Sequence, residues 1–502
     1  MSKAKCIMVQ GTMSGAGKSL LCAALCRIFA QDGYRTAPFK SQNMALNSFV
    51  TKDGLEMGRA QVVQAQAAGM EPDVRMNPIL LKPSSDVGSQ VIVNGEVRGQ
   101  MPAAAYFKMK KSLIPDILSA YNSLAEDVDI IVIEGAGSPA EINLKADDIV
   151  NMGLAKLVDA PVLLAGGIDR GGVFAQLYGT VELLEPDERA RIKGLIINKF
   201  RGDVEILRPG LVMLEEKTHL PVLGVVPYLK VDIEDEDSLS ERLDTGKAVK
   251  PLDVAILRLP HISNFTDFIP LEQHPLLGVR YVQNTRQLGA PDLVILPGTK
   301  NTVDDLLWLR QSGLEAVLQK LAARGTPVLG VCGGYQMLGE TLEDPTGSES
   351  GRPQTLRGLA LLPTRTVFTE QKHRTQDTAA AVAEPFAGAA LEGYEIHTGR
   401  TEVQGSPFCT LADGTPEGCV QGSVFGTYLH GLFDTGALTE KLTAYLCARK
   451  GIDPAGAALI PMEQYRQQQF DLLADGVRHA LDMDKIYAAM GLTPAARKED
   501  SV

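Results

Sequence analysis

The chain has 502 residues, of which 45% are hydrophobic and 22% are charged, so it carries enough apolar surface to fold and is not a disordered chain. Its 49 basic and 61 acidic residues give a net charge of −12, which argues against general binding to nucleic acids or anionic membranes. No apolar run approaches the roughly 18 residues that cross a bilayer, no signal-peptide pattern follows Met1, and the seven Cys are scattered as expected for reduced thiols. We therefore expect a cytoplasmic protein built from several α/β domains.

Residues 1–233 are predicted to form an ATP-binding α/β domain with a doubly wound, mostly parallel sheet. Short and nearly continuous apolar runs alternate with helical stretches, which is typical of parallel strands covered by helices on both faces. The expected strands are residues 6–10, 36–40, 129–133, 161–165, 194–198 and 222–226.

A glycine-rich loop follows the first of these strands and leads into a helical stretch. It reads Gly11-Thr12-Met13-Ser14-Gly15-Ala16-Gly17-Lys18-Ser19. Backbone N–H groups of such a loop, together with the start of the next helix, bind the phosphates of a nucleotide. We predict that Gly11, Thr12, Gly15 and Gly17 shape an ATP site, with Lys18 on the β and γ phosphates and the Ser19 hydroxyl on Mg²⁺. The alternative is a glycine-rich turn that binds nothing.

Two more polar residues stand at or just after the ends of expected strands, where groups of a doubly wound sheet face the ligand crevice. Glu134 follows the apolar run 129–133 and is a candidate Mg²⁺ ligand, the alternative being an ordinary charge at a strand end. Lys40 closes the second strand and is a candidate ATP-binding residue. Asp53 is a further candidate for the metal.

Residues 234–250 are acidic and lack hydrophobic periodicity, so a solvated linker is expected there. A second doubly wound domain is predicted over residues 251–440, with strands at 253–257, 278–282, 292–296, 327–331 and 423–428. Within it, residues 344–357 are rich in Gly, Pro and Ser and favour a surface loop. Residues 441–502 are expected to form a helical extension.

A candidate nucleophile, Cys332, lies between the expected strand 327–331 and a helical stretch. Two glycines follow it, which allows the sharp turn that exposes a nucleophile at the end of a strand. A cysteine nucleophile needs a base, and His430 follows another expected strand. Gly298 follows a third strand and could donate its backbone N–H to an oxyanion. The alternative for Cys332 is a buried structural thiol.

These motifs carry a resemblance to known families. The segments VCGGYQMLG and GTYLHGLF resemble the class I glutamine amidotransferase domain, and the N-terminal half resembles dethiobiotin synthetase, which shares the spacing of the phosphate loop. Together with PFKSQNM, GRAQ, GGIDRGG, NKFRGD, LPGTKNT and GYEIHTGR, the chain resembles the cobyric acid synthase family over nearly all of residues 4–490. The resemblance implies a P-loop, dethiobiotin synthetase-like domain followed by an amidotransferase-like domain.

The resemblance also implies a reaction with glutamine, ATP and a corrinoid polycarboxylate as small-molecule substrates. Cys332 would attack the glutamine carboxamide to release ammonia, and His430 would relay protons. MgATP would phosphorylate an acceptor carboxylate, and ammonia would displace the phosphate. The acceptor implied is adenosylcobyrinic acid a,c-diamide, amidated at carboxylates b, d, e and g to give cobyric acid. By the same resemblance, Asn198 would read the adenine edge.

The sequence departs from most class I amidotransferases at one position. A Glu usually stands two residues after the catalytic His, and here Leu432 takes its place. Glu395 is a candidate to orient His430 instead, with a structural role as the alternative, whereas His373 is expected to be an ordinary structural histidine.

The sequence also offers candidate acceptor-binding groups and rival functions. Candidates to bind an acceptor carboxylate or phosphate are Arg59, Lys82 and Arg170, the alternative for Arg170 being a surface role. Rival functions are cobyrinic acid a,c-diamide synthase, CTP synthase, and an ATPase switch with an inactive amidotransferase domain. The sequence leaves the oligomeric state open.

Overall fold

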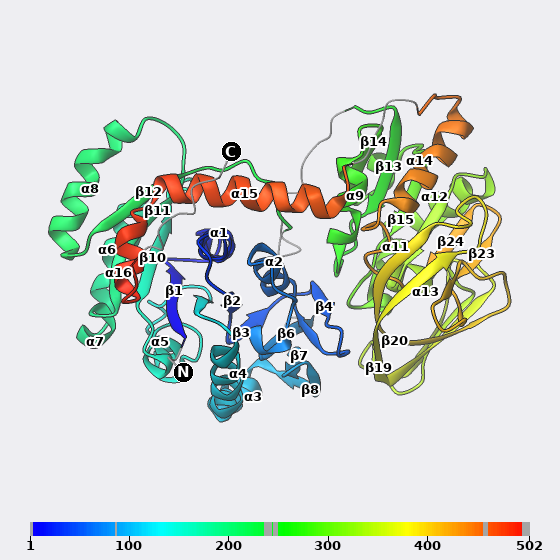
Figure 1. The fold of residues 1–502 in the computed structure, drawn as a ribbon. Coiled ribbons are helices and arrows are strands. Elements are labelled where there is room, and N and C mark those ends of the chain that lie inside the picture. The colour runs from blue at the N-terminus through cyan, green and yellow to red at the C-terminus, as the bar shows by residue number, and fades with distance from the viewer. Residues whose placement is uncertain (1–3, 86–87, 235–242, 244–248, 455–459, 494–502) are drawn as a thin grey trace. The chain divides into compact units, whose positions relative to one another are not determined.

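A computed structural model describes residues 4–85, 88–234, 243, 249–454 and 460–493. Contacts divide the chain into two compact units (Figure 1). Unit 1 comprises Met1–Met44, Glu56–Ile233 and Arg466–Val502, and unit 2 comprises Ala45–Leu55 and Glu234–Tyr465. Two stretches therefore belong to a different unit from the residues next to them in sequence. Ala45–Leu55 belongs to unit 2, and the chain from Arg466 onward belongs to unit 1.

Unit 1 is built on a six-stranded, fully parallel sheet in the order β12-β11-β10-β1-β9-β2. This confirms the predicted doubly wound sheet. The apolar strands are buried because helices cover both faces. The bounds are β1 (Lys5–Gly11), β2 (Thr36–Phe39), β9 (Ile130–Glu134), β10 (Val162–Gly167), β11 (Ile192–Phe200) and β12 (Val222–Pro227).

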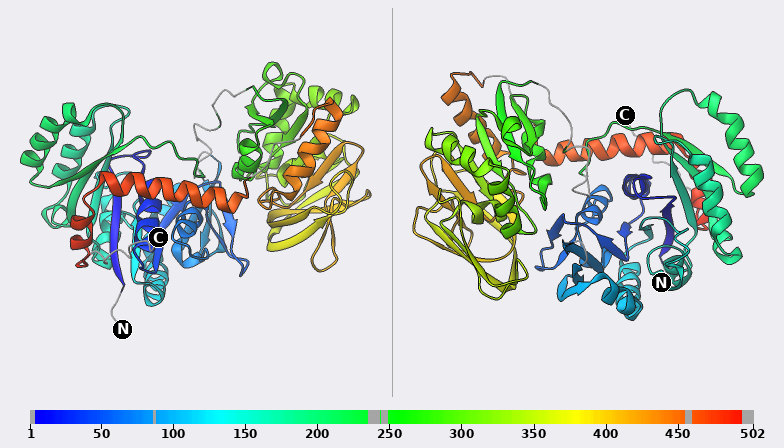
Figure 2. Two further views of the ribbon diagram at one scale, coloured as in Figure 1. Left: turned by 45° about the horizontal axis from the view of Figure 1, so that its top comes forward. Right: turned by 180° about the vertical axis from the view of Figure 1, so that it is seen from behind.

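The helices of unit 1 come from both ends of the sequence, as the blue and red ribbons of Figure 2 show. Helix α1 (Lys18–Gln31) follows β1, and α15 (Met462–Ala480) and α16 (Met483–Ala489) share its apolar core through Phe470, Leu473 and Tyr487. The remaining helices are α2 (Arg59–Ala67), α3 (Ala103–Met109), α4 (Ile114–Asp127), α5 (Met152–Val158), α6 (Val173–Leu183), α7 (Pro186–Arg189) and α8 (Val204–Thr218).

A second, four-stranded sheet of unit 1 runs in the order β3-β6-β7-β8 and was not predicted from the sequence. Its strands are β3 (Gln42–Met44), β6 (Ile79–Ser85), β7 (Gly88–Val93) and β8 (Glu96–Pro102), and β5 (Glu56–Gly58) lies between β3 and β6 in sequence. Strand β8 has no buried residue, so it offers no apolar run to recognise.

Unit 2 contains the second predicted sheet, in the order β14-β13-β15-β16-β24-β23. All neighbours are parallel except the edge strand β23, which is antiparallel to β24. The strands are β13 (Leu252–Leu257), β14 (Leu277–Val282), β15 (Leu293–Leu296), β16 (Val328–Val331), β23 (Cys419–Gln421) and β24 (Val424–Thr427). The helices are α9 (Ile269–Gln273), α10 (Thr285–Leu288), α11 (Thr302–Gln311), α12 (Leu314–Ala323), α13 (Gly333–Leu338) and α14 (Ala437–Lys450).

A mixed sheet packs in the same unit and was also missed by the sequence reading. It is dominated by the long antiparallel pair β19 (Thr364–Ala381) and β20 (Ala390–Val403). The expected surface loop at 344–357 is partly wrong, because β18 (Gln354–Arg357) pairs with β17 (Thr341–Asp344). Strand β18 is polar and has no buried residue, so its sequence resembles a loop. The shorter strands are β21 (Cys409–Leu411) and β22 (Pro416–Glu417).

One expectation falls largely outside the described residues. It is the acidic linker at 234–250, where only residues 234, 243, 249 and 250 are described. Within the part of the chain that the structure describes, no helix combines the length and apolarity needed to span a bilayer.

Candidate active sites

The first candidate site is the loop between β1 and α1 in unit 1. Gly15 and Gly17 have φ angles of +77° and +89°, in the left-handed region that favours glycine. A Cβ on Gly17 would lie 2.2 Å from Asn198 Nδ2, so only glycine fits there. Lys18 Nζ donates to the backbone carbonyls of Met13 and Gly137, each at 3.1 Å, and is thereby held inside the curve of the loop. This arrangement suits a chain of phosphates.

Asn198 lies against this loop. Its Nδ2 donates to the carbonyl of Ala16 at 3.0 Å, so the side-chain amide braces the loop from the end of β11. Its expected role at the adenine edge stays a prediction. Thr12 contributes a further contact, since its hydroxyl donates to Gln176 Oε1 at 3.1 Å.

Glu134 is the centre of a buried polar cluster at the end of β9. Its Oε1 accepts from Ser19 Oγ at 2.8 Å and from Lys40 Nζ at 3.0 Å, and its Oε2 accepts from Gln64 Nε2 at 2.6 Å. Burial raises the pKa of Glu134, but the Lys40 charge and the hydrogen bonds outweigh it, so the net pKa lies below its usual value. The carboxylate is therefore ionised and ready to ligate a cation.

The residues of this cluster fit Mg²⁺. Ser19 and Glu134 supply adjacent oxygen atoms, the ligand type that this hard cation prefers. In addition, Gln64 Oε1 is buried without a hydrogen-bond partner among the described atoms, which leaves an acceptor for water bound to the ion.

The other residues expected at this site lie in different surroundings. Lys82 Nζ forms a buried ion pair with Glu56 Oε1 at 2.9 Å. Arg59 is buried at the start of α2, and Arg170 is exposed. Asp53 is exposed and belongs to Ala45–Leu55 of unit 2. Their roles toward substrate or metal stay predictions.

The second candidate site is at the turn between β16 and α13 in unit 2. Cys332 occupies this turn with a φ of +50°, a strained conformation for a residue with a Cβ. Its N–H donates to the carbonyl of Thr427 at 2.8 Å, which ties the turn to the end of β24. A Cβ on Gly334 would lie 2.0 Å from the backbone oxygen of Leu296, so the close approach needs glycine. These are the features of a nucleophile elbow.

His430 is buried beside Cys332 and is bonded to a carboxylate that the sequence analysis missed. His430 Nδ1 lies 2.7 Å from Asp267 Oδ2, and the Gly431 N–H donates to Asp267 Oδ1 at 3.1 Å. Cys332 lies near enough to the same imidazole to affect its pKa, while its Sγ donates to the Ile396 carbonyl at 3.7 Å. Burial lowers the pKa of His430, but the Asp267 charge and hydrogen bond, with Cys332, outweigh it and raise the pKa to about 10.

Asp267 lies in η5 (Phe265–Phe268), a short 3₁₀ helix that follows β13. The pair is separated by 163 positions in sequence, so no local spacing links them. The one available signal was an acidic residue inside the apolar stretch Phe265-Thr266-Asp267-Phe268-Ile269, because a buried carboxylate needs a partner.

Glu395 is not the partner of His430. Its Oε2 lies 3.3 Å from His373 Nε2 and 3.3 Å from His397 Nε2. The reason is strand geometry: Tyr394 stacks on His430, and the next residue along β20 points to the opposite face. Burial raises the pKa of Glu395, but the two imidazoles outweigh it and lower the pKa to about 2. The side chains of His373, Glu395 and His397 are of types that can bind a metal ion. The hydrogen bond with Glu395 raises the pKa of His373, so a protonated His373 can also balance the charge of the carboxylate.

Gly298 lies directly against His430. A Cβ added to Gly298 would sit 2.9 Å from His430 Cε1, and the Gly298 carbonyl accepts from the Ser263 N–H at 2.9 Å. The backbone at Gly298 is therefore close to the imidazole, as an oxyanion role requires. That role stays a prediction.

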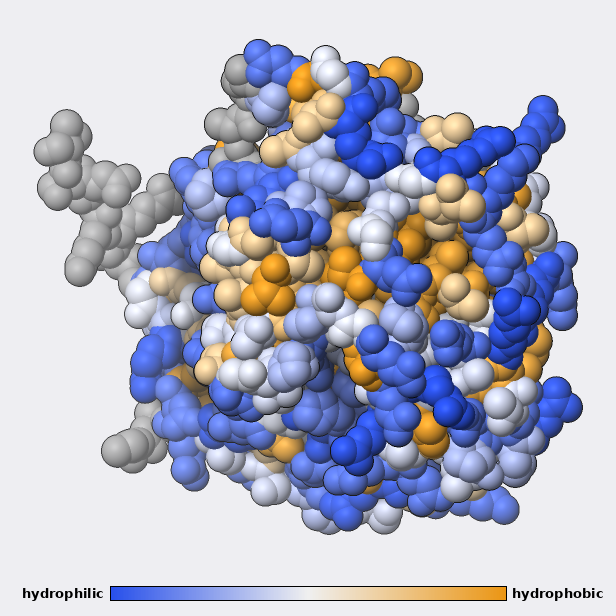
Figure 3. Space-filling model, turned by 90° about the vertical axis from the view of Figure 1, so that its right-hand side faces the viewer, coloured by the Kyte–Doolittle hydropathy of each residue, from blue (hydrophilic) through white to orange (hydrophobic). Residues whose placement is uncertain are grey.

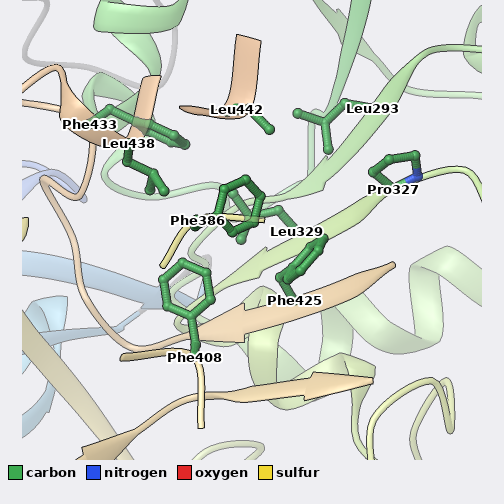
Figure 4. A pocket seen from close by; sticks show the side chains of 9 residues that line it. All are labelled: Leu293, Pro327, Leu329, Phe386, Phe408, Phe425, Phe433, Leu438 and Leu442. Atoms are coloured by element: carbon green, nitrogen blue, oxygen red, sulfur yellow. The ribbon is translucent and has the colours of Figure 1, made fainter. Parts of the chain in front are cut away.

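An apolar pocket in the same unit is not a candidate for the glutamine site. Figure 4 shows the side chains that line it, and the lining consists entirely of apolar residues: Leu293, Pro327, Leu329, Phe386, Phe408, Phe425, Phe433, Leu438 and Leu442. A zwitterionic amino acid needs polar partners.

On the face drawn in Figure 3, apolar side chains gather across the middle, and hydrophilic side chains surround them.

Comparisons with known proteins match both halves of the chain. The CobQ/CobB/MinD/ParA nucleotide binding domain matches residues 7–239, and the CobB/CobQ-like glutamine amidotransferase domain matches residues 253–438. Together with the two sites, these matches define an enzyme that joins a nucleotide-binding domain to a glutamine amidotransferase domain.

Proteins that match nearly the whole chain show which family within this class the chain belongs to. The chain is 56% identical to the cobyric acid synthase of Lachnoclostridium phytofermentans, over 97% of this chain and 99% of the relative. It is 55% identical to that of Ruminiclostridium cellulolyticum, over 96% of each chain, and 52% identical to that of Streptococcus sanguinis, over 96% and 98%. The chain belongs to the cobyric acid synthase family and is a glutamine-hydrolysing ligase.

Proposed function

We propose that this enzyme uses glutamine and ATP to amidate carboxylates b, d, e and g of adenosylcobyrinic acid a,c-diamide, which gives cobyric acid. The arrangement of Cys332, His430 and Asp267 carries the proposal, because it provides a nucleophile, a proton carrier and a carboxylate that orients it. The likeness to cobyric acid synthases over nearly the full length supports the choice of acceptor.

Ammonia would be released in unit 2. The Cys332 sulfur attacks the carboxamide carbon of glutamine while His430 accepts the thiol proton. The Gly298 N–H stabilises the oxyanion that develops on the carbonyl oxygen. His430 then returns the proton to the leaving nitrogen, and water hydrolyses the thioester to glutamate. Asp267 would hold Nδ1, which leaves Nε2 to carry the proton.

The carboxylate would be activated in unit 1. A carboxylate has no usable leaving group at neutral pH, so transfer of the ATP γ-phosphoryl group to it gives an acyl phosphate and ADP. Ammonia then attacks the acyl carbon, and phosphate leaves as the amide forms. Lys18 and the loop N–H groups hold the phosphates in line, and Lys40 is a further cation at the site. Ser19 and Glu134 would hold Mg²⁺, which would supply positive charge to offset that of the phosphates.

The remaining candidates complete the proposal. Asn198 would face the adenine, and Arg59, Lys82 and Arg170 would bind acceptor carboxylates or phosphate. All seven cysteines are buried thiols, which is compatible with a cytoplasmic enzyme.

The test is the mass of the corrinoid product in assays with adenosylcobyrinic acid a,c-diamide and MgATP. With glutamine, the wild type is expected to add four amides. Cys332→Ser is expected to lose the glutamine-dependent reaction and retain turnover with free ammonia, since the loss is confined to the nucleophile.

Two results would overturn the proposal. Normal use of glutamine by Cys332→Ser would remove Cys332 from the reaction. Conversion of unamidated cobyrinic acid to its a,c-diamide, with no reaction of the diamide itself, would identify the sister activity instead.

A further inference from the structure

The segment Ala45–Leu55 belongs to unit 2, although the residues on both sides of it belong to unit 1. It contributes β4 (Ser48–Val50), and its two ends continue directly into the chain of β3 and β5. Its position within the first 55 residues gives no hint of contacts with residues more than 200 positions away.

One set of contacts fixes the start of the 3₁₀ helix that carries Asp267. Asn47 Oδ1 accepts from the Asn264 N–H at 2.8 Å, and the Ser48 N–H donates to Asn264 Oδ1 at 3.4 Å. Asn264 has a φ of +52° and immediately precedes η5. These reciprocal hydrogen bonds, all buried, hold a strained residue three positions before the carboxylate that binds His430.

A second set of contacts fixes Tyr394, which covers His430. The Tyr394 hydroxyl donates to the Ser48 carbonyl at 3.1 Å and accepts from Asn264 Nδ2 at 3.0 Å. Its ring stacks on the His430 imidazole, with centroids 5.4 Å apart at 25°, while Phe49 packs against it edge-on at 5.3 Å.

The backbones of Tyr394 and His430 are also joined. The Tyr394 N–H donates to the His430 carbonyl at 3.1 Å, and the His430 N–H donates to the Tyr394 carbonyl at 2.9 Å. A displacement of Tyr394 would therefore be passed to the imidazole through both the ring and the main chain.

We propose that Asn47, Ser48 and Phe49 form a positioning element of the amidotransferase site, because they hold Asp267 through Asn264 and His430 through Tyr394. This inference rests on the proposed function of Cys332 and His430 in glutamine hydrolysis. The titratable groups that face the imidazole are Asp267, Cys332 and Tyr394, and the segment adds no charge of its own to them. It acts by geometry, since a catalytic pair displaced by even 1 Å loses rate steeply.

The amidotransferase site then depends on the N-terminal part of the chain. A fragment that begins after the linker would lack Asn47, Ser48 and Phe49 and so would lose both sets of contacts. The segment is also continuous with β3, which follows Lys40 and its contact with Glu134.

The test uses two substitutions in the full-length enzyme. Asn47→Ala removes the acceptor for Asn264, and Tyr394→Phe keeps the stacked ring but removes the hydroxyl that joins it to the segment. For each, kcat for glutamine hydrolysis is expected to fall about tenfold with little change in KM, as for one lost buried hydrogen bond. The alkaline limb of the pH profile should move to lower pH, because a loosened Asp267 contact lowers the His430 pKa. Ammonia-dependent amidation should be unchanged.

Met44→Ala is the matched control, since Met44 directly precedes the segment and its side chain is 59% exposed. It should leave all three readouts unchanged. Unaltered kcat and pH profile in both test variants would overturn the positioning role. An equal loss of ammonia-dependent activity would also overturn it, because the effect would then be a general loss of structure. A Cys332→Ser enzyme that still hydrolyses glutamine would instead reject the proposed function itself.

Discussion

At the scale of single residues, the proposed glutamine hydrolysis depends on the contact between Asp267 and His430. The carboxylate stabilises the charged imidazole, so the pKa of His430 rises to about 10. A group whose pKa is raised on folding contributes stability below its unfolded pKa near 6.5, and that contribution is lost as the pH rises toward 10. In the proposed reaction, the raised pKa favours the imidazolium that forms when His430 takes the thiol proton and that then donates to the leaving nitrogen.

Asp267→Asn tests this contact. The amide keeps the size of the side chain but removes its charge, and its NH₂ can donate to Nδ1 and so impose the wrong tautomer. We expect kcat for glutamine hydrolysis to fall about 10²- to 10⁴-fold, with the alkaline limb of the pH profile shifted toward neutral pH.

Glu395→Gln is the informative comparison for Asp267→Asn. The described contacts of Glu395 are with His373 and His397, so its neutralisation should leave the alkaline limb in place. If the alkaline limb of the pH profile shifted in Glu395→Gln but not in Asp267→Asn, Glu395 would be the residue that orients His430.

At the scale of elements, the turn from β16 into α13 depends on an approach closer than a side chain allows. Gly334→Ala would place a Cβ 2.0 Å from the Leu296 carbonyl oxygen, which is backbone and cannot rotate away. We expect a loss of about 1–3 kcal/mol in the free energy of unfolding, with loss of glutaminase activity because the turn moves Cys332.

Gly179→Ala provides the control for this substitution. Gly179 lies inside α6, and a Cβ there meets no atom within 4 Å. The change should be neutral or stabilise by up to about 1 kcal/mol, since alanine favours the helix. Denaturant unfolding of both variants measures the contrast, and similar destabilisation of the two would contradict the steric explanation.

At the scale of the whole molecule, the end of the chain completes the core of unit 1. Phe470, Leu473, Val477 and Tyr487 are buried with residues of α1, although more than 430 positions separate them in sequence. Arg27 adds an ion pair with Asp471 at 2.8 Å. The core of the nucleotide-binding unit therefore includes residues that follow the amidotransferase part of the chain in sequence.

Two adjacent leucines of α15 test this dependence. Leu473 is 1% exposed and Leu472 is 55% exposed. Leu473→Ala should destabilise unit 1 by about 2–5 kcal/mol, because it leaves a cavity in the shared core. Leu472→Ala should change stability by no more than about 0.5 kcal/mol. The measurement is the unfolding transition that MgATP shifts, and equal effects of the two changes would argue against a core role for α15.

The sequence by itself determined the two doubly wound sheets, the phosphate loop, the turn at Cys332 and the family. These features are encoded locally, in runs of apolar residues and in glycines at turns, so they can be read without knowing what packs where. The mixed sheet around β19 and β20 was missed because its strands are long, polar and half-exposed.

Only the tertiary structure decided which groups surround His430. Asp267 replaced Glu395 as the partner because η5 brings it to the imidazole, whereas strand alternation turns Glu395 to the other face of β20. The placement of Ala45–Leu55 in unit 2 and of α15 in unit 1 was equally invisible in the sequence. Contacts between residues hundreds of positions apart depend on how whole elements pack, and no local pattern of residues records them.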